Sequence, residues 1–357
     1  GATPALVADF NNDGVTDILA VNSQRTEAVL YLNNGRGVFT KQALAGLLTG
    51  DLAGYRQISH ADIDADGDLD LLFNINATTG GGIAAVFNQA STSQTASPLF
   101  TGKSYLIKTS WKNASFSVTD ANNDGKSDLV IVQTNGNWPN DTHVNHPASL
   151  YLNTGASASD YQNPGTKTLA GFTEKTNCGI ISSSEFSNFV SVDLDNDGDM
   201  DLVNGSSDWP SASIPHIYIN DGTGTYTQKD SPIIHGRFYH HGLTVFDADL
   251  DGDQDAVWTS LHNFSDIYPR MWENGITYLK ATAGNATVDP AKAFYDSTTA
   301  WGINARIPGS GNLGSAGYAA DLDGDGDLDF VAQGWNGWGS EKYYKVYRND
   351  SDLKSPN

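Results

Sequence analysis

The chain has 357 residues and a formal net charge of −22. This acidity argues against a nucleic-acid partner, because a polyanion would be repelled. No stretch approaches the roughly 18 uncharged apolar residues of a membrane span, and the single cysteine, Cys178, excludes an intrachain disulfide. Short runs rich in Val, Ile and Tyr between Gly, Asn and Asp clusters favour an all-β fold. We expect a secreted or cell-surface protein whose signal peptide is absent or already removed before Gly1.

A nine-residue acidic motif recurs six times along the chain. Each copy reads Asp-x-Asp/Asn-x-Asp-Gly-x-x-Asp. We name the copies loop 1 to loop 6 and number their positions 1 to 9. Their starts are separated by 53, 58, 73, 54 and 74 residues. The loops begin at Asp9, Asp62, Asp120, Asp193, Asp247 and Asp321.

The spacing of oxygen-bearing residues in each loop predicts a calcium site. Ca²⁺ takes about six to eight oxygen ligands, and positions 1, 3 and 5 place three short side chains on one side of a curled loop. Gly at position 6 permits a turn with positive φ. Position 7 varies from Val to Lys and would offer its backbone carbonyl, whereas the Asp at position 9 would close the site. The predicted ligands are Asp9, Asn11, Asp13, Val15 and Asp17 in loop 1; Asp62, Asp64, Asp66, Asp68 and Asp70 in loop 2; Asp120, Asn122, Asp124, Lys126 and Asp128 in loop 3; Asp193, Asp195, Asp197, Asp199 and Asp201 in loop 4; Asp247, Asp249, Asp251, Asp253 and Asp255 in loop 5; and Asp321, Asp323, Asp325, Asp327 and Asp329 in loop 6.

The start of the motif also matches an EF-hand, which needs a Glu at position 12 and a helix on each side. The flanks here are β-prone runs, such as residues 6–8 and 18–21 around loop 1. The sequence therefore predicts a strand–loop–strand hairpin. Metal-free turns are the alternative, but clustered carboxylates would repel one another without a cation. Position 12 holds Ala20, Phe73, Ile131, Asn204, Trp258 and Ala332.

A second strand pair follows the loops, as in residues 29–33 with 37–40 and 216–220 with 224–227. Each unit would then contain four strands, and repeated four-stranded units predict a β-propeller. Six loops predict six blades of about 60 residues in one domain, residues 1–357. We interpret the polar segments 134–146, 156–169 and 281–312 as insertions. A blade without a metal loop in one of them would give seven blades, which is the alternative.

The acidic loops combined with Tyr-x-Asn-x-Gly-x-Gly-x-Phe tails, as in residues 31–39, resemble the FG-GAP/VCBS repeat. That repeat builds the integrin α-subunit head, fungal lectins and many secreted bacterial propellers. The likeness covers nearly the whole chain, although the Phe-Gly…Gly-Ala-Pro signature of integrins is missing, so the VCBS type is closer. The resemblance implies a structural calcium ion between the first and second strands of each blade, about six in all. It implies no single activity.

The loops also predict where a ligand would bind. Because each loop follows the innermost strand of its blade, the metals would share one face, and a ligand would meet the opposite face. Aromatic rings recur there beside Arg, Asn and Glu, a mixture that suits sugars, since rings stack on C–H faces while polar groups bond hydroxyls. Packing between blades is the alternative for each ring. The predicted ligand-binding residues are Tyr55, Arg56, Trp111, Glu185, Asn188, Trp209, Arg237, Tyr239, Trp258, Tyr318 and Trp335.

Three functions remain open from the sequence. We favour a lectin or adhesion protein that binds a poly- or oligosaccharide. The second is a polysaccharide lyase or another glycan-active enzyme, because some secreted propellers of this kind resemble lyases that use Tyr and His as acid and base and Arg to neutralise a uronate. The third is a module that binds a cell-surface glycoprotein. The catalytic candidates would be His240, His241, Tyr239, Arg237 and His60.

The sequence makes a separate prediction about the orientation of the adjacent histidines His240 and His241. Neighbouring residues of a strand point to opposite faces, so at most one of them would face the opening. A zinc site is a further alternative, although no short ligand spacing links the histidines of this chain.

Overall fold

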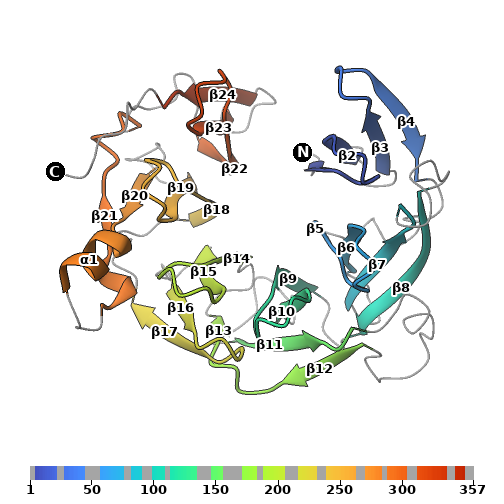
Figure 1. Ribbon diagram of the computed structural model, residues 1–357, viewed down its shortest axis with the longest axis horizontal. Helices are drawn as coiled ribbons and strands as arrows, with labels where there is room; N and C mark the ends of the chain where they lie inside the picture. Colours follow the sequence, from blue (N-terminus) through green and yellow to red (C-terminus); the bar gives the residue numbers. More distant parts are fainter. Residues whose placement is uncertain are drawn as a thin grey trace. The chain divides into compact units, whose positions relative to one another are not determined.

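The chain folds as an all-β propeller of six blades, each an antiparallel sheet, and the six-blade prediction is confirmed (Figure 1). The computed structural model describes residues 5–21, 28–44, 57–75, 82–90, 99–108, 113–134, 146–155, 171–182, 188–205, 216–230, 239–262, 270–283, 288–303, 312–335 and 342–349. The chain consists of two compact units, Gly1–Cys178 and Gly179–Asn357. Within the described ranges, no helix has the length and apolar character needed to cross a bilayer.

The first unit contains three four-stranded blades, in which consecutive strands pair in chain order. Blade 1 has β1 (Ala5–Ala8), β2 (Asp17–Val21), β3 (Ala28–Asn33) and β4 (Phe39–Ala43). Blade 2 has β5 (Ile58–Ala61), β6 (Asp70–Ile75), β7 (Gly82–Asn88) and β8 (Phe100–Lys108). Blade 3 has β9 (Asn113–Thr119), β10 (Asp128–Thr134), β11 (His146–Asn153) and β12 (Phe172–Lys175).

The second unit begins with the two-residue strand β13 (Ile181–Ser182) and contains blades 4 to 6. Blade 4 has β14 (Asn188–Val192), β15 (Asp201–Gly205), β16 (His216–Asn220) and β17 (Tyr226–Asp230). Blade 5 has β18 (Tyr239–Phe246), β19 (Asp255–His262), β20 (Arg270–Asn274) and β21 (Phe294–Asp296). In the described part of blade 6 there are three strands, β22 (Asn312–Ala320), β23 (Asp329–Trp335) and β24 (Lys342–Tyr347).

The hydrophobic core lies between neighbouring blades of a unit. Alternate residues of a strand point to opposite faces, so each central strand serves two core layers. In β6, Leu71 and Phe73 pack with Phe10 against blade 1, whereas Leu72 packs with Leu129 against blade 3. All five side chains are fully buried. The double-sided packing explains why the second strands read as nearly continuous apolar runs.

The segment 281–312 is not a simple insertion, and the prediction for it was partly wrong. It contains β21, the fourth strand of blade 5, and the 3₁₀-helix η3 (Pro290–Lys292). The short helix α1 (Ile276–Ala283), which the sequence analysis did not predict, precedes them. After Gly275 the usual tail is replaced by a run containing Leu, Lys and Ala, which favour helices. Residues 135–145 and 156–169, which belong to the other two interpreted insertions, lie outside the described residues.

Candidate metal centre

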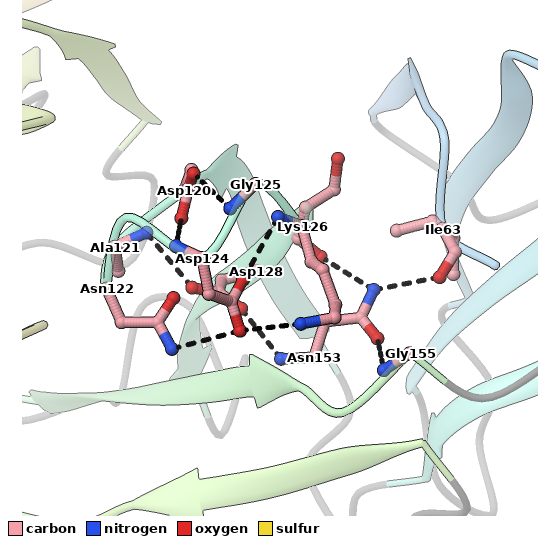
Figure 2. Close-up of polar contacts among 11 residues, drawn as sticks. Ile63, Asp120, Ala121, Asn122, Asp124, Gly125, Lys126, Asp128, Asn153 and Gly155 are labelled. Carbon is pink, nitrogen blue, oxygen red and sulfur yellow. Dashed lines mark hydrogen bonds and ion pairs between the residues drawn. The ribbon is translucent and has the colours of Figure 1, made fainter. Parts of the chain in front are cut away.

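Each acidic loop connects the first and second strands of its blade, as predicted. The backbone has positive φ at positions 4 and 6 of every loop, for example 56° at Asn12 and 84° at Gly14. A Cβ added to Gly14 would meet nothing within 4 Å, so glycine is needed there for its backbone conformation and not for space. The carboxylate at position 1 holds the curl, since Asp120 accepts hydrogen bonds from the backbone N–H groups of Asp124 (3.1 Å) and Gly125 (2.9 Å) (Figure 2).

The side chains at positions 1, 3 and 5 converge in the loops that carry Asp at all three positions. One carboxylate oxygen from each position lies within 4.8 Å of the other two, which is a spacing that one metal ion can bridge. In loops 1 and 3 an Asn takes position 3. The four converging triads are Asp62–Asp64–Asp66, Asp193–Asp195–Asp197, Asp247–Asp249–Asp251 and Asp321–Asp323–Asp325.

The chemistry of these loops fits a hard cation. The Oδ1 atoms of Asn122, Asp195 and Asp247 are buried and accept no hydrogen bond. A buried polar atom without a partner costs about 1–3 kcal/mol, which coordination to a cation would offset. Carboxylate, amide and carbonyl oxygens are the ligands of Ca²⁺ and similar ions, whereas zinc favours nitrogen and sulfur. Several loops can therefore hold a metal ion at positions 1, 3 and 5.

The Asp at position 9 connects its loop to the third strand through backbone hydrogen bonds, a role that the sequence did not predict. Its two oxygens accept different backbone N–H groups: in loop 4, Asp201 accepts those of Leu194 (3.0 Å) and Asn220 (2.8 Å). The same pair of contacts recurs in all six loops. These carboxylates are almost completely buried. Their role as metal ligands stays a prediction.

Burial shifts the acidity of the position-9 carboxylates. It raises the pKa of Asp70 and of Asp255 to about 8, and that of Asp201 to about 7, although the two backbone hydrogen bonds act in the opposite direction. The neighbouring loop carboxylates add repulsion in each case. A cation in the loop would favour the ionised form of all these groups.

A recurring asparagine at the end of the third strand joins neighbouring loops. Its backbone N–H donates to the position-9 Asp of its own blade, and in blades 2, 3, 5 and 6 its side-chain amide also donates to a carbonyl in the loop of the preceding blade. In Figure 2, Asn153 Nδ2 donates to Ile63 O (2.8 Å). The same atom also donates to Ser127 O (3.2 Å). The corresponding contacts in other blades join Asn88 to Phe10, Asn274 to Leu194 and Asn349 to Ala248. We call Asn33, Asn88, Asn153, Asn220, Asn274 and Asn349 the latch asparagines.

Replacement of Asn153 by Ala is expected to lower the free energy of unfolding by about 2–4 kcal/mol. The variant loses the bonds to Ile63 and Ser127 and leaves their carbonyls without this donor, in a buried place. Urea titration of both proteins measures the difference. Asn33→Ala is the matched control, because Asn33 is half-buried and its amide donates to Thr16 of its own loop. An equal loss in both variants would contradict the role of the contact between blades.

Between loops 1 and 2, and between loops 4 and 5, a second contact joins position 4 of one loop to position 7 of the next. Asn12 Nδ2 lies 2.7 Å from Asp68 Oδ1, and Asn196 Nδ2 lies 2.6 Å from Asp253 Oδ1. Helix α1 reinforces the second pair, since Thr277 donates to Asp253 through both its backbone N–H (2.8 Å) and its hydroxyl (2.5 Å). Asp68 and Asp253 are fully buried. Their side chains therefore link loops, which leaves their backbone carbonyls as the predicted ligands.

The predicted ligand-binding residues are only partly described. Tyr55, Arg56, Trp111, Glu185, Trp209 and Arg237 lie outside the described residues. Asn188 and Tyr239 begin β14 and β18, and Trp335 ends β23, so these three lie at strand ends away from the loops. Trp258 lies within β19. Tyr318 is 60% exposed but lies near the loop end of β22, so it is closer to loop 6 than we expected.

The candidate histidines differ from expectation in position and register. His60 lies in β5 next to loop 2, where it packs edge-to-face on Phe10 with ring centroids 5.9 Å apart, and burial lowers its pKa. His240 and His241 lie in β18, but the pairing with β19 shifts register between His240 and Gly242. Simple alternation of side chains fails at such an irregularity. That at most one of the two histidines faces the opening stays a prediction.

The family comparison agrees with this geometry. Residues 9–73 and 193–258 match the model of the FG-GAP-like repeat family. Each begins at the first residue of one loop and ends in the strand after the next loop, so each FG-GAP-like segment spans two acidic loops.

Solved structures of two other proteins are similar to this chain. One shows the recognition of non-reducing terminal N-acetylglucosamine by a lectin from Agrocybe aegerita, with 16% sequence identity and a TM-score of 0.52. The alignment covers 98% of the present chain and 80% of the lectin chain. Another is the catalytic domain of the GH62 α-L-arabinofuranosidase of Coprinopsis cinerea, with 12% identity, coverage of 82% and 89%, and a TM-score of 0.36. Among curated proteins, none matches this chain. At 16% identity, the likeness to the lectin establishes a shared fold.

Proposed function

We propose that this protein is a secreted β-propeller that binds carbohydrate and is stabilised by about six calcium ions. The observation that carries the proposal is the fold likeness over 98% of the chain to a lectin that recognises terminal N-acetylglucosamine. The FG-GAP-like repeats and the carboxylate triads support the calcium part. The net charge of −22 disfavours a polyanionic ligand.

Calcium would act as a structural ion. Positions 1, 3 and 5 would hold it with their side chains, and position 7 with its backbone carbonyl. When bound, the ion supplies positive charge to a chain in which 26 of 42 acidic residues lie in the six loops. The position-9 aspartates and the latch asparagines connect each loop to the strands behind it. Calcium would thus fix the orientation of the blades while the ligand binds elsewhere.

The ligand would bind at the strand ends away from the loops. Asn188, Tyr239 and Trp335 lie at such ends and combine an amide with two aromatic rings. Rings stack on the apolar face of a sugar, and the amide bonds its hydroxyl or acetamido groups. Glycans that end in N-acetylglucosamine are the first candidates.

A glycan array that compares glycans ending in N-acetylglucosamine and in galactose tests the proposal. We expect the calcium-loaded protein to bind a defined glycan class, and Tyr239→Ala to weaken binding roughly tenfold, as loss of a stacked ring does. Tyr278→Ala is the matched control, because Tyr278 is exposed on α1 beside the loops. Incubation of the bound polysaccharide with the protein, followed at ultraviolet wavelengths for unsaturated products, separates a lectin from a lyase. Failure to bind any glycan would refute the proposal.

A further inference from the structure

The residue that precedes each latch asparagine occupies the same structural position in all six blades. Each latch asparagine donates its backbone N–H to Oδ1 of the position-9 Asp at 2.7–2.8 Å, so the register of third strand and loop is shared. The preceding residue is apolar in blades 1 to 4 but charged in blades 5 and 6. In chain order these residues are Leu32, Phe87, Leu152, Ile219, Glu273 and Arg348.

In blade 6 this position carries a cation next to the loop. The Arg348 guanidinium forms an ion pair with Asp323, the position-3 residue of loop 6. The Arg348 guanidinium is therefore paired with one of the carboxylates that would bind the metal. The triad of loop 6, Asp321–Asp323–Asp325, is also the exposed one, so water weakens its attraction for an ion.

In blade 5 the same position carries an anion. Glu273 is half-buried, and its carboxylate accepts a hydrogen bond from Trp301 Nε1, which holds it in place. Because Asn274 and Asn349 share the same register, Glu273 occupies the position beside loop 5 that Arg348 occupies beside loop 6. The triad of loop 5 is partly buried in all three residues.

We propose that the residue before the latch asparagine sets the metal affinity of the adjacent loop, so that, among the four loops with five aspartates, loop 5 binds calcium most tightly and loop 6 most weakly. The inference rests on the calcium part of the proposed function. The number of ligand charges tunes calcium affinity in oxygen sites. Glu273 adds a negative charge beside loop 5, whereas Arg348 must give up Asp323, or share it, when loop 6 binds an ion. Loop 6 is then the first of these four loops to release its ion as the concentration of free calcium falls.

Charge-only substitutions in the full chain test this inference. In Arg348→Gln the cation is lost, and in Glu273→Gln the side chain keeps an oxygen for Trp301 but loses its charge. Lys41→Gln and Glu174→Gln make the same charge changes in the exposed outer strands β4 and β12. Native mass spectrometry at buffered free calcium counts the bound ions, and competition with a chromophoric chelator gives the affinities. We expect Arg348→Gln to tighten one site, and Glu273→Gln to weaken one site, by roughly tenfold each, with less than a twofold change in the controls.

Double variants assign each effect to its loop. Asp325→Ala in loop 6 and Asp251→Ala in loop 5 should each reduce the ion count by one, with the loop 6 ion lost at the higher calcium concentration in the wild type. The effect of Arg348→Gln should vanish in the Asp325→Ala background, and that of Glu273→Gln in the Asp251→Ala background. Effects that persist there, or affinities that do not change in the single variants, would overturn the inference while leaving calcium binding intact. A protein that retains no calcium at all would instead refute the calcium part of the proposed function.

Discussion

Removal of calcium with EDTA is expected to lower the melting temperature of the loaded protein by roughly 15 °C or more. Calcium would bind the folded loops and not the unfolded chain, and each site filled at 100 times its Kd adds about 2.7 kcal/mol. Several such sites sum to roughly 10 kcal/mol or more. Domains of about 150–250 residues shift by about 2–4 °C for each kcal/mol, and a chain of 357 residues shifts by somewhat less. The metal-free protein would also keep the unscreened repulsion among 26 loop carboxylates.

Thermal unfolding followed by circular dichroism measures this effect. The calcium-loaded, EDTA-treated and calcium-restored samples should be compared at equal ionic strength, because salt alone screens the repulsion between carboxylates. Added Mg²⁺ is expected to restore less stability than Ca²⁺, since it demands a stricter octahedral geometry and retains its water. Identical melting curves with and without EDTA would refute calcium binding by these loops.

The sequence predicts the blades because their signals are local. The acidic motif fixes the turn, Gly at position 6 takes the positive φ that was expected, and the flanking runs form the first and second strands. The Tyr-x-Asn-x-Gly tail places the third strand, as in β3. Short elements are harder to predict. The three-residue strand β21 gives no periodic pattern, and α1 departs from the repeat in a single blade among the described residues.

The roles of polar residues could not be predicted where their partners are distant in sequence. The latch asparagine recurs in every repeat, so its recurrence is a visible signal, but its partner does not follow from it: Asn349 binds Ala248 across 101 residues. The position-9 Asp similarly binds a strand 16 to 25 residues away. The spacing of the motif predicts only a metal ligand at position 9. The burial of this Asp and its two backbone contacts show that it supports the loop.

Loop 4 allows these two roles to be separated by a pair of substitutions. Asp201→Ala at position 9 leaves the buried N–H groups of Leu194 and Asn220 without their acceptor, so it should lower the free energy of unfolding by about 3–5 kcal/mol. This loss is expected with calcium and in EDTA alike. Asp195→Ala at position 3 removes a triad oxygen that accepts no hydrogen bond. It should cost about 2–3 kcal/mol when calcium is present, through loss of one site.

In EDTA the Asp195→Ala variant should be as stable as the wild type, or slightly more stable. In the wild type, burial and the neighbouring charge of Asp197 raise the pKa of Asp195 to about 6, so the ionised Asp195 side chain is unfavourable in the metal-free loop. Denaturant titrations of both variants, each with calcium and with EDTA, give the four differences. If Asp201→Ala loses stability only when calcium is present, the position-9 carboxylate acts as a ligand and its backbone contacts contribute little. If Asp195→Ala is equally destabilised in both buffers, position 3 supports the loop itself and the metal assignment to that triad fails.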